Sequence, residues 1–491
     1  MKRTFLTLLI LLSALSAALA EDCFPRVILK GDYPDPTIMR DGRDFYMTHS
    51  SFKYGPSFLI WHSQDLVHWE PVCRALPRVS GALAPDMHKY KGKYYIYYPA
   101  NRKTFVITAD NIRGPWSKPV EVKGCVGIDP GHVATIDGKR YLFTDNGRMA
   151  QLNEEGTALT EPMRTVYKGW DIPKDWVTEG QWPEKYLESP KLVYHDGYYY
   201  LTSAEGGTAG PATSHMVVSA RSKSVDGPWE ESPYNPIVHT WSADEEWWSK
   251  GHGTLIDDAD GNWWLVYHAY RKDLHTLGRQ TLLEPVEWTA DGWFRTKKTA
   301  PLPKASKKIR HGFCLSDDFT KDALGLQWTF YREYAPKAIQ TGGGRLLMTG
   351  KENDAPRYLL TTAEDERYEV QVEVDARDTQ AGLMLFYRDH AFSGACTDSV
   401  NYYVFHQGSL IKTIPHGKDT RCFFKLSNIH NRLSVYASAN GRKWNVLAED
   451  LDISKMNHNY LNGFLAMRPA LMVKGHSTAE FRRFVYKPLA D

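Results

Sequence analysis

The sequence lacks the features that mark several classes of protein. Its 491 residues carry a formal net charge of only +2, so no excess of either sign indicates a nucleic-acid partner or a charged membrane surface. Helical periodicity is almost absent, and no apolar run after the first twenty residues is long enough to span a bilayer. We therefore expect an all-β protein that neither binds nucleic acid nor inserts into a membrane.

Cysteine is also scarce. The 6 cysteines are widely scattered without a C-x-x-C pair, which argues against a zinc site or a dithiol redox site. In an oxidising compartment an even number of cysteines permits disulfides. A bond between Cys396 and Cys422 is one interpretation, and several buried free thiols are the other.

Residues 1–20 have the composition of an export signal. Lys2 and Arg3 precede a mostly apolar stretch from Phe5 to Leu15, and Ala18-Leu19-Ala20 fits a cleavage site. We expect a signal peptide over 1–20 and a secreted or periplasmic mature protein.

What the chain does have is an internal repeat. In each copy a short apolar segment leads through a tight turn into an aromatic-rich strand. The copies are PDPTIMRDGRDFYMTHSS from Pro34, APDMHKYKGKYYIYYPA from Ala84, DPGHVATIDGKRYLFTDN from Asp129, ESPKLVYHDGYYYLTSAE from Glu188 and a looser GHGTLIDDADGNWWLVYHAY from Gly251. The turn glycines, which indicate β-hairpins, are Gly42, Gly92, Gly138, Gly197 and Gly261.

A second element follows the hairpin in three copies and predicts an outer strand pair with a buried Trp69, Trp116 or Trp229. A hairpin plus an outer pair makes a four-stranded unit of roughly 45–60 residues, the size of a propeller blade. Five such units predict a five-bladed β-propeller over residues 21–300.

The rest of the chain predicts a second domain. Residues 301–314 are basic and proline-bearing and indicate a linker. Alternating runs at 368–375, 381–387, 432–438 and 480–486 then predict a β-sandwich, concanavalin-like, over 315–491. Such a domain either binds carbohydrate or braces the propeller.

Three carboxylates occupy matching positions in different repeats. Asp35, Asp129 and Glu188 each lie at the start of the first strand of a repeat. The inner strands of a propeller surround one axis, so we expect these side chains to meet in a central funnel. Crowded carboxylates raise one another's pKa, which can supply an acid and a base for glycosidic-bond hydrolysis.

The segments GDYPDPTIMRDGRDFYMTHSSF, IDPGHVATIDGKRYLF, ESPKLVYHDGYYYL and LGRQTLLEPVEW resemble glycoside hydrolase family 43. The resemblance implies inversion of anomeric configuration. By it, Asp35 corresponds to the general base and Glu188 to the general acid. Asp129 corresponds to the carboxylate that orients the acid and modulates its pKa.

The same resemblance suggests further site residues. His252 matches a funnel histidine that ligates a calcium ion or a water around it, so a structural calcium is an option although no cofactor is required. Arg279 matches an arginine that contacts the sugar, and Phe52 matches a wall of that pocket. Where many relatives have Trp-Ala-Pro, this chain has Leu83-Ala84-Pro85, so a stacking surface is either missing or supplied from elsewhere, with Trp176 and Trp182 as the candidates.

Each assignment has a structural alternative. An Asp before Pro commonly caps a turn, and Asp86, at the same phase as Asp35, serves as the structural control. Glu179 is a rival acid in the segment before Glu188. Similarly, His252 could be an interior hydrogen-bonded histidine and Arg279 a structural ion-pair partner.

These observations lead to one expected function. It is a secreted, exo-acting, inverting hydrolase of a plant-type oligo- or polysaccharide. The resemblance implies that it releases terminal α-L-arabinofuranosyl residues as first choice or β-D-xylosyl residues as a close second. The alternatives are a β-galactosidase or galactofuranosidase of the same fold, a retaining fructan-cleaving propeller, and a non-catalytic carbohydrate-binding propeller.

Overall fold

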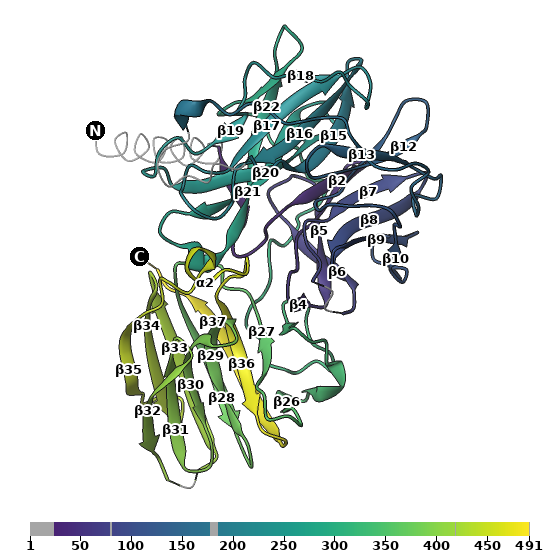
Figure 1. Ribbon diagram of the computed structural model, residues 1–491. Coiled ribbons are helices and arrows are strands. Elements are labelled where there is room, and N and C mark those ends of the chain that lie inside the picture. The colour runs from purple at the N-terminus through teal and green to yellow at the C-terminus, as the bar shows by residue number, and fades with distance from the viewer. Residues whose placement is uncertain (1–23, 79–80, 177–184, 418, 491) are drawn as a thin grey trace, which may run out of the picture.

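The computed structural model describes residues 24–78, 81–176, 185–417 and 419–490. Two bodies built almost entirely of β-strands lie one above the other in Figure 1, with the N-terminal part of the chain in the upper one. Within the described ranges, no helix combines the length and apolarity needed to cross a membrane. The predicted signal peptide, residues 1–20, lies outside the described residues.

The upper body is the predicted propeller, and four of its blades follow the chain in order. The first consists of β2 (Thr37–Asp41), β3 (Asp44–Thr48), β5 (Ser57–Ser63) and β6 (Glu70–Leu76). The second consists of β7 (Asp86–Tyr90), β8 (Lys93–Ala100), β9 (Lys103–Ala109) and β10 (Val120–Glu121). The third consists of β11 (Gly131–Ala134), β12 (Arg140–Thr144), β13 (Arg148–Leu152) and β14 (Arg164–Thr165). The fourth consists of β15 (Glu188–His195), β16 (Tyr198–Glu205), β17 (Met216–Ser222) and β18 (Glu230–Glu231), with β19 (Val238–His239) also paired to β17.

The fifth blade joins the two ends of the propeller. Its strands are β20 (Trp247–Asp257), β21 (Trp263–Arg271), β22 (Arg279–Trp288) and β23 (Phe294–Thr296), together with β1 (Arg26–Leu29). Strand β1 pairs antiparallel with β22, so the start of the described chain completes the last blade and closes the ring. The repeat pattern did not predict this strand, because four residues carry no hairpin signal.

The turn glycines confirm the predicted hairpins. Gly42, Gly92, Gly138, Gly197 and Gly261 have φ values of +67°, +83°, +83°, +84° and +85°. An added Cβ would meet no atom within 4 Å at any of the five. Glycine is therefore required at these turns for its positive φ and not for lack of space.

Of the three outer tryptophans that were predicted to be buried, only Trp69 is. Trp69 is fully buried, and its indole N–H donates to the carbonyl of Leu66 at 2.9 Å. Trp116 and Trp229 are only half-buried. Trp69 belongs to a buried core cluster, whereas Trp116 and Trp229 pack against the outside of such clusters.

The lower body is the predicted sandwich of two antiparallel sheets (Figure 1). The first sheet contains β32 (Ser409–Pro415), β31 (Asn401–His406), β30 (Ala391–Thr397), β29 (Gln380–Arg388), β36 (Arg468–Lys474), β27 (Arg357–Leu360), β24 (Thr329–Tyr331) and β4 (Tyr54–Gly55). The second sheet contains β25 (Ile339–Gly342), β26 (Arg345–Thr349), β37 (Thr478–Pro488), β28 (Arg367–Asp375), β33 (Arg421–Ile429), β34 (Arg432–Ser438) and β35 (Asn445–Asp452). Strand β28 alternates half-buried and buried residues along its whole length, as one core-facing side of a sheet requires.

The propeller and the sandwich are joined by a shared sheet and by contacts of the linker. Strand β4 lies between β3 and β5 in the chain, yet it pairs with β24 at the edge of a sandwich sheet. Within the expected linker, the Gly312 N–H donates to the Trp69 carbonyl at 2.8 Å, and the adjacent Phe313 ring lies 5.1 Å from that of Trp61. These residues therefore pack along the first blade.

The suggested disulfide between Cys396 and Cys422 is wrong. Both residues are buried free thiols on opposite sheets of the sandwich, and Cys73, Cys125 and Cys314 are also free. Burial raises the pKa of Cys396 to about 12, so its thiol stays protonated and unreactive.

Candidate active site

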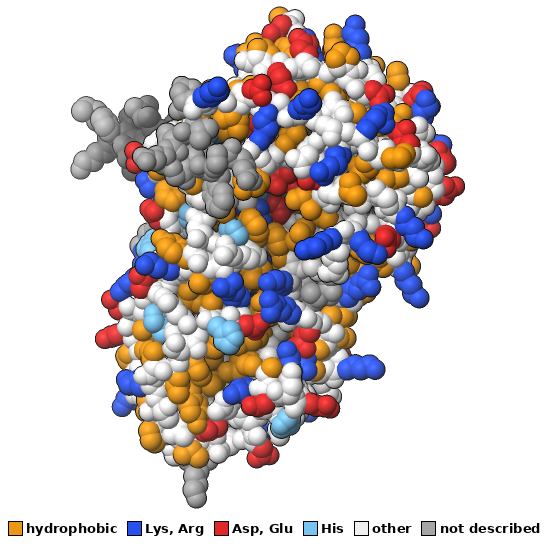
Figure 2. Space-filling model, in the orientation of Figure 1, with side chains coloured by type: hydrophobic (Ala, Val, Ile, Leu, Met, Phe, Trp, Pro, Cys, Tyr) orange, Lys and Arg blue, Asp and Glu red, His pale blue; other side chains and the backbone are white. Residues whose placement is uncertain are grey.

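The three predicted carboxylates come together at the inner ends of three blades. Asp35 precedes β2, Asp129 precedes β11, and Glu188 is the first residue of β15. Ligand atoms of Asp129, Glu188 and His252 lie within 4.8 Å of one another, and His252 Nδ1 is 3.5 Å from Asp35 Oδ1. Figure 2 shows acidic side chains at the base of a hollow in the propeller face.

Backbone strain marks the same place. Asp35, Asp129, Ser189 and His252 have φ values of +56°, +53°, +55° and +58°. Left-handed conformations are uncommon for residues other than glycine and cost of order 1–3 kcal/mol each. Two of these strained residues, Asp35 and Asp129, lie just before an inner strand, and the other two lie within one.

Asp35 is held as a carboxylate. Arg279 Nη1 donates to Asp35 Oδ1 at 2.7 Å, and the Ser50 hydroxyl donates to Oδ2. Burial by itself would raise the pKa of Asp35, but the charge of Arg279 outweighs it and holds the pKa well below its usual range. Asp35 therefore remains ionised in a buried site.

Asp129 and Glu188 show the opposite behaviour. Burial first, and then the charge of Asp35, raise the pKa of Asp129 to about 8. Burial, followed by repulsion from Asp129 and Asp35, raises the pKa of Glu188 well above its usual value. At neutral pH this pair retains protons beside an ionised Asp35.

Two neutral histidines line the Asp35 side of the funnel. The Asp35 N–H donates to His268 Nδ1 at 3.1 Å, which leaves Nε2 protonated to donate to the Thr208 hydroxyl at 3.2 Å. Burial lowers the pKa of His268 to about 4 and that of His252 well below its usual value. His252 Nε2 is buried and has no hydrogen-bond partner among the described residues.

The side chains of the funnel include two groups that could ligate a metal ion. The two groups of potential ligands are Asp35 with His252 and His268, and Asp129 with Glu188 and His252. Calcium takes six to eight oxygen ligands, whereas both groups contain imidazole nitrogen and the oxygen of Asp35 already faces Arg279. Neither group forms an oxygen cage, so the described residues do not fit directly coordinated calcium.

Asp86 has the structural surroundings expected of the control. Lys191 Nζ donates to Asp86 Oδ1 at 2.9 Å and to the Pro130 carbonyl at 3.0 Å, and the His132 N–H donates to Asp86 Oδ2. Burial opposes ionisation of Asp86, but Lys191 and His88 outweigh it and lower its pKa to about 2. The sequence interpretation missed Lys191, whose charge also acts on Asp129.

One wall of the site comes from both domains. The Arg279 guanidinium lies 5.5 Å from the centre of the Phe52 ring and 5.2 Å from that of Phe464, and the two rings stack at 6.1 Å. Phe464 belongs to the sandwich, in the loop between α2 (His458–Leu461) and β36. Its neighbours in sequence show no motif, so only the domain packing could reveal it.

The remaining residues singled out in the sequence have different outcomes. Arg279 forms the ion pair that its structural alternative foresaw, and its guanidinium also lies over the Phe52 ring. Leu83 packs against the core of the sandwich. Trp182 and the rival acid Glu179 lie outside the described residues.

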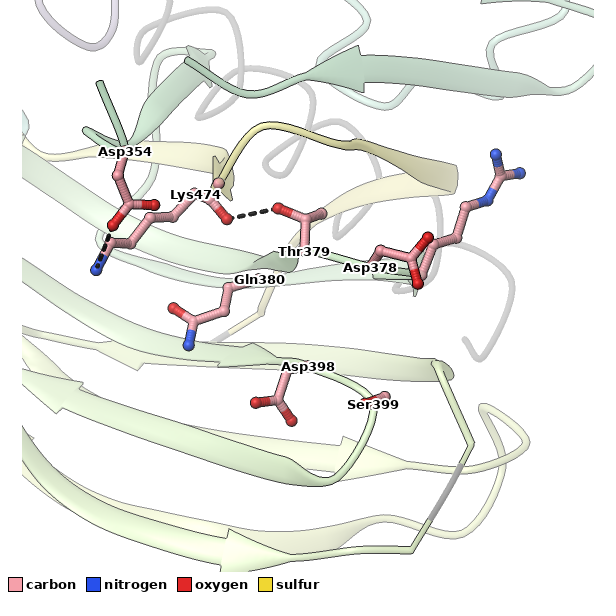
Figure 3. Close-up of a pocket in the computed structure, with 9 residues that line it drawn as sticks. Asp354, Asp378, Thr379, Gln380, Asp398, Ser399 and Lys474 are labelled. Carbon is pink, nitrogen blue, oxygen red and sulfur yellow. Dashed lines mark hydrogen bonds and ion pairs between the residues drawn. The ribbon is translucent and has the colours of Figure 1, made fainter. Parts of the chain in front are cut away.

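A second hollow lies in the sandwich (Figure 3). It has a volume of about 420 Å³ and is lined by Asp354, Arg377, Asp378, Thr379, Gln380, Asp398, Ser399, Lys474 and Gly475. Asp398 accepts hydrogen bonds from Tyr403 and from backbone N–H groups, so it is already satisfied locally. The lining includes no aromatic ring that could stack on a sugar, which makes the propeller funnel the better candidate.

Known proteins share this architecture. The chain is 33% identical over 402 residues to the non-reducing end alpha-L-arabinofuranosidase BoGH43B of Bacteroides ovatus, covering 73% of this chain and 72% of that protein. It is 36% identical over 297 residues to a xylosidase/arabinosidase of Butyrivibrio fibrisolvens, covering 54% of this chain and 55% of that one. The solved structure of the GH43 protein BlXynB from Bacillus licheniformis covers 95% of this chain and 100% of its own, with a TM-score of 0.84 and 27% identity.

Family models agree with both domains. The C-terminal concanavalin A-like domain of beta xylosidases matches residues 316–487. Glycosyl hydrolases family 43 matches residues 24–294, which include the three carboxylates, His252 and Arg279. The chain therefore belongs to glycosyl hydrolase family 43 and is a glycoside hydrolase.

Proposed function

We propose that this protein is an exo-acting, inverting glycosidase that uses Asp35 as general base and Glu188 as general acid. The observation that carries the proposal is the opposite displacement of two pKa values in one funnel. The pKa of Asp35 is held low by Arg279, whereas that of Glu188 is raised by burial and by neighbouring carboxylates. Inverting glycosidases require such an ionised base and such a protonated acid.

The residues divide the reaction between them. Asp35 accepts a proton from water as the water oxygen bonds to the anomeric carbon, while Glu188 donates its proton to the departing glycosidic oxygen. The products are a free sugar of inverted configuration and a shortened saccharide, with Asp35 protonated and Glu188 ionised. Proton exchange with solvent restores both groups.

Asp129 acts on Glu188 and not on the substrate. Its own pKa of about 8 leaves it a poor base or nucleophile at neutral pH. Carboxylate oxygens of Asp129 and Glu188 lie within 4.8 Å of each other. That separation is too short for the acid and base of an inverting enzyme, whose carboxyl groups are about 6.5–9.5 Å apart. Both facts favour the role of modulating the acid.

The substrate is a terminal α-L-arabinofuranosyl or β-D-xylosyl residue of a plant-type polysaccharide. The names of the relatives, arabinofuranosidase and xylosidase/arabinosidase, support this choice. The apolar, export-type residues 1–20 support a secreted or periplasmic enzyme. We expect no cofactor to take part, since the ligand groups of the funnel do not form an oxygen cage.

A panel of nitrophenyl glycosides tests the proposal. We expect hydrolysis of the α-L-arabinofuranoside, the β-D-xyloside or both, and much less of the β-galactoside and galactofuranoside. Proton NMR of the first product should show the inverted anomer. Retention would assign the reaction to the fructan-cleaving type, and no hydrolysis of any glycoside would favour a non-catalytic binding propeller.

A further inference from the structure

An aromatic cluster lies at the fourth blade, in the segment before β15 and at and after β19. Trp241 is 63% exposed, and its ring meets that of Trp176 edge-on at 5.0 Å. Trp176 stacks on His239 at 5.6 Å and meets Trp170 at 5.7 Å. We call Trp170, Trp176, His239 and Trp241 the tryptophan platform.

The strand register places this platform relative to Glu188. Glu188 pairs with Ala204, Ala204 with Val217, and Val217 with Val238, next to His239. Three strand spacings of about 4.8 Å separate Glu188 from Val238, or roughly 14 Å. The platform therefore lies at the same end of the blade as the acid, beyond the reach of a sugar bound in the funnel.

Hydrogen bonds from backbone N–H groups fix two residues of the platform. The Trp170 N–H donates to Oε1 of the fully buried Glu205, the residue after Ala204, at 2.7 Å. The Trp241 N–H donates to Glu245 Oε1 at 2.7 Å, and Lys250 Nζ holds the other oxygen of Glu245 at 2.6 Å. These anchors fix the backbone at Trp170 and Trp241 and leave most of the Trp241 ring uncovered.

Packing explains only part of the cluster. Trp176 and Trp170 are half-buried and contribute to the blade surface. Trp241 contributes less, because most of its ring is open to solvent and is therefore free to meet a ligand. A rigid, uncharged aromatic face beside a glycosidase funnel fits the apolar face of a sugar ring, with the indole N–H available for a hydroxyl.

We propose that the tryptophan platform binds a neutral sugar ring of the polysaccharide chain on the leaving-group side of the scissile bond. This inference rests on the proposed function. It implies that the enzyme recognises a chain several units long, while the terminal sugar alone occupies the funnel. Short substrates gain nothing from the platform.

Affinity electrophoresis tests this binding without turnover. Native gels containing soluble arabinan, arabinoxylan or xylan are run with the wild type, Trp241→Ala and the control Tyr194→Ala. Tyr194 is 43% exposed near the opposite end of strand β15, so it matches the loss of an exposed aromatic ring on the same blade. Thermal unfolding of each variant confirms that it is folded, and Trp241→Phe is the conservative replacement.

We expect at least one polysaccharide to retard the wild type, Tyr194→Ala and, in part, Trp241→Phe. Trp241→Ala should bind about fivefold more weakly, the factor that corresponds to one aromatic contact. Equal retardation of Trp241→Ala and wild type, or no retardation of the wild type in any gel, would overturn the platform.

Kinetics separate this inference from the proposed function. Trp241→Ala should retain wild-type kcat/KM on nitrophenyl glycosides and lose about fivefold on the polysaccharide. An equal loss on both substrates would contradict the platform. If instead the wild type hydrolysed no glycoside while the gels showed the difference at Trp241, the hydrolase proposal would fail and the binding site would stand.

Discussion

Arg468 of strand β36 and Asp32, just ahead of Asp35, form an ion pair of 3.2 Å across the boundary between sandwich and propeller. Both side chains are largely buried, and the Arg468 guanidinium lies 3.9 Å over the Tyr54 ring. Burial raises the pKa of Asp32, while Arg468 and then Arg279 oppose that rise. The sandwich thus supplies the positive charge of Arg468 that pairs with the buried Asp32 of the propeller.

Replacing Arg468 by Met should destabilise the protein, because it leaves a buried carboxyl without its partner. The expected loss is about 3–5 kcal/mol, measured as a lower unfolding midpoint in denaturant. The double variant Arg468→Met with Asp32→Asn should recover much of that loss. Equal stabilities of the double and the single variant would show that the charge of Asp32 is not the cause.

The pH dependence of kcat/KM should be bell-shaped and asymmetric. Activity needs an ionised Asp35, so it is lost as pH falls through the low pKa of that residue, well below 4. Activity also needs a protonated Glu188, so it is lost as the coupled pair with Asp129 deprotonates at alkaline pH. An acidic limb near neutrality, in assays where the protein remains folded, would contradict the assigned base.

Glu188→Gln should lower kcat by about 10²–10⁴-fold, the usual contribution of a general acid. The substitution should also stabilise the protein at neutral pH. Because the folded-state pKa of Glu188 is raised, its burial costs stability that grows as pH rises from about 4.3 toward that pKa. Gln carries no such cost.

Thermal unfolding of Glu188→Gln should therefore show a midpoint about 2–4 °C higher than wild type at pH 7. The difference should vanish near pH 4, where the wild-type carboxyl is protonated in both states. A constant difference at both pH values would mean that titration of Glu188 is not responsible.

Phe464→Ala should weaken the binding of short substrates through loss of the aromatic surface beside Phe52 and Arg279. We expect KM for a nitrophenyl glycoside to rise about three- to tenfold with kcat within a factor of two. Phe464→Tyr is the matched control, since it keeps the stacked ring. A fall in kcat at unchanged KM would argue that the loop positions Arg279 instead.

Removal of divalent metal should leave the reaction intact, since the funnel groups do not form an oxygen cage for calcium. After dialysis against a chelator, kcat/KM should stay within twofold of the starting value. A large loss that added calcium restored would assign the ion to His252 and the surrounding carboxylates.

Much of the propeller could be predicted from the sequence because its signals are local. A hairpin turn such as Asp41-Gly42, with its positive-φ glycine, joins two strands only a few residues apart. The matching phase of Asp35, Asp129 and Glu188 follows from the same repeat. The fold class and the meeting of the three carboxylates could therefore be predicted from the sequence alone.

Other features depend on contacts between distant segments, which no local pattern encodes. The closing strand β1, the exchange of β4 into the sandwich and the approach of Phe464 to Arg279 all arise from packing of whole domains. The same holds for protonation, because Asp35 and Glu188 carry the same chemical group. Only the tertiary arrangement, with Arg279 against one carboxyl and two carboxyls against the other, decides which carboxyl is held ionised and which retains its proton.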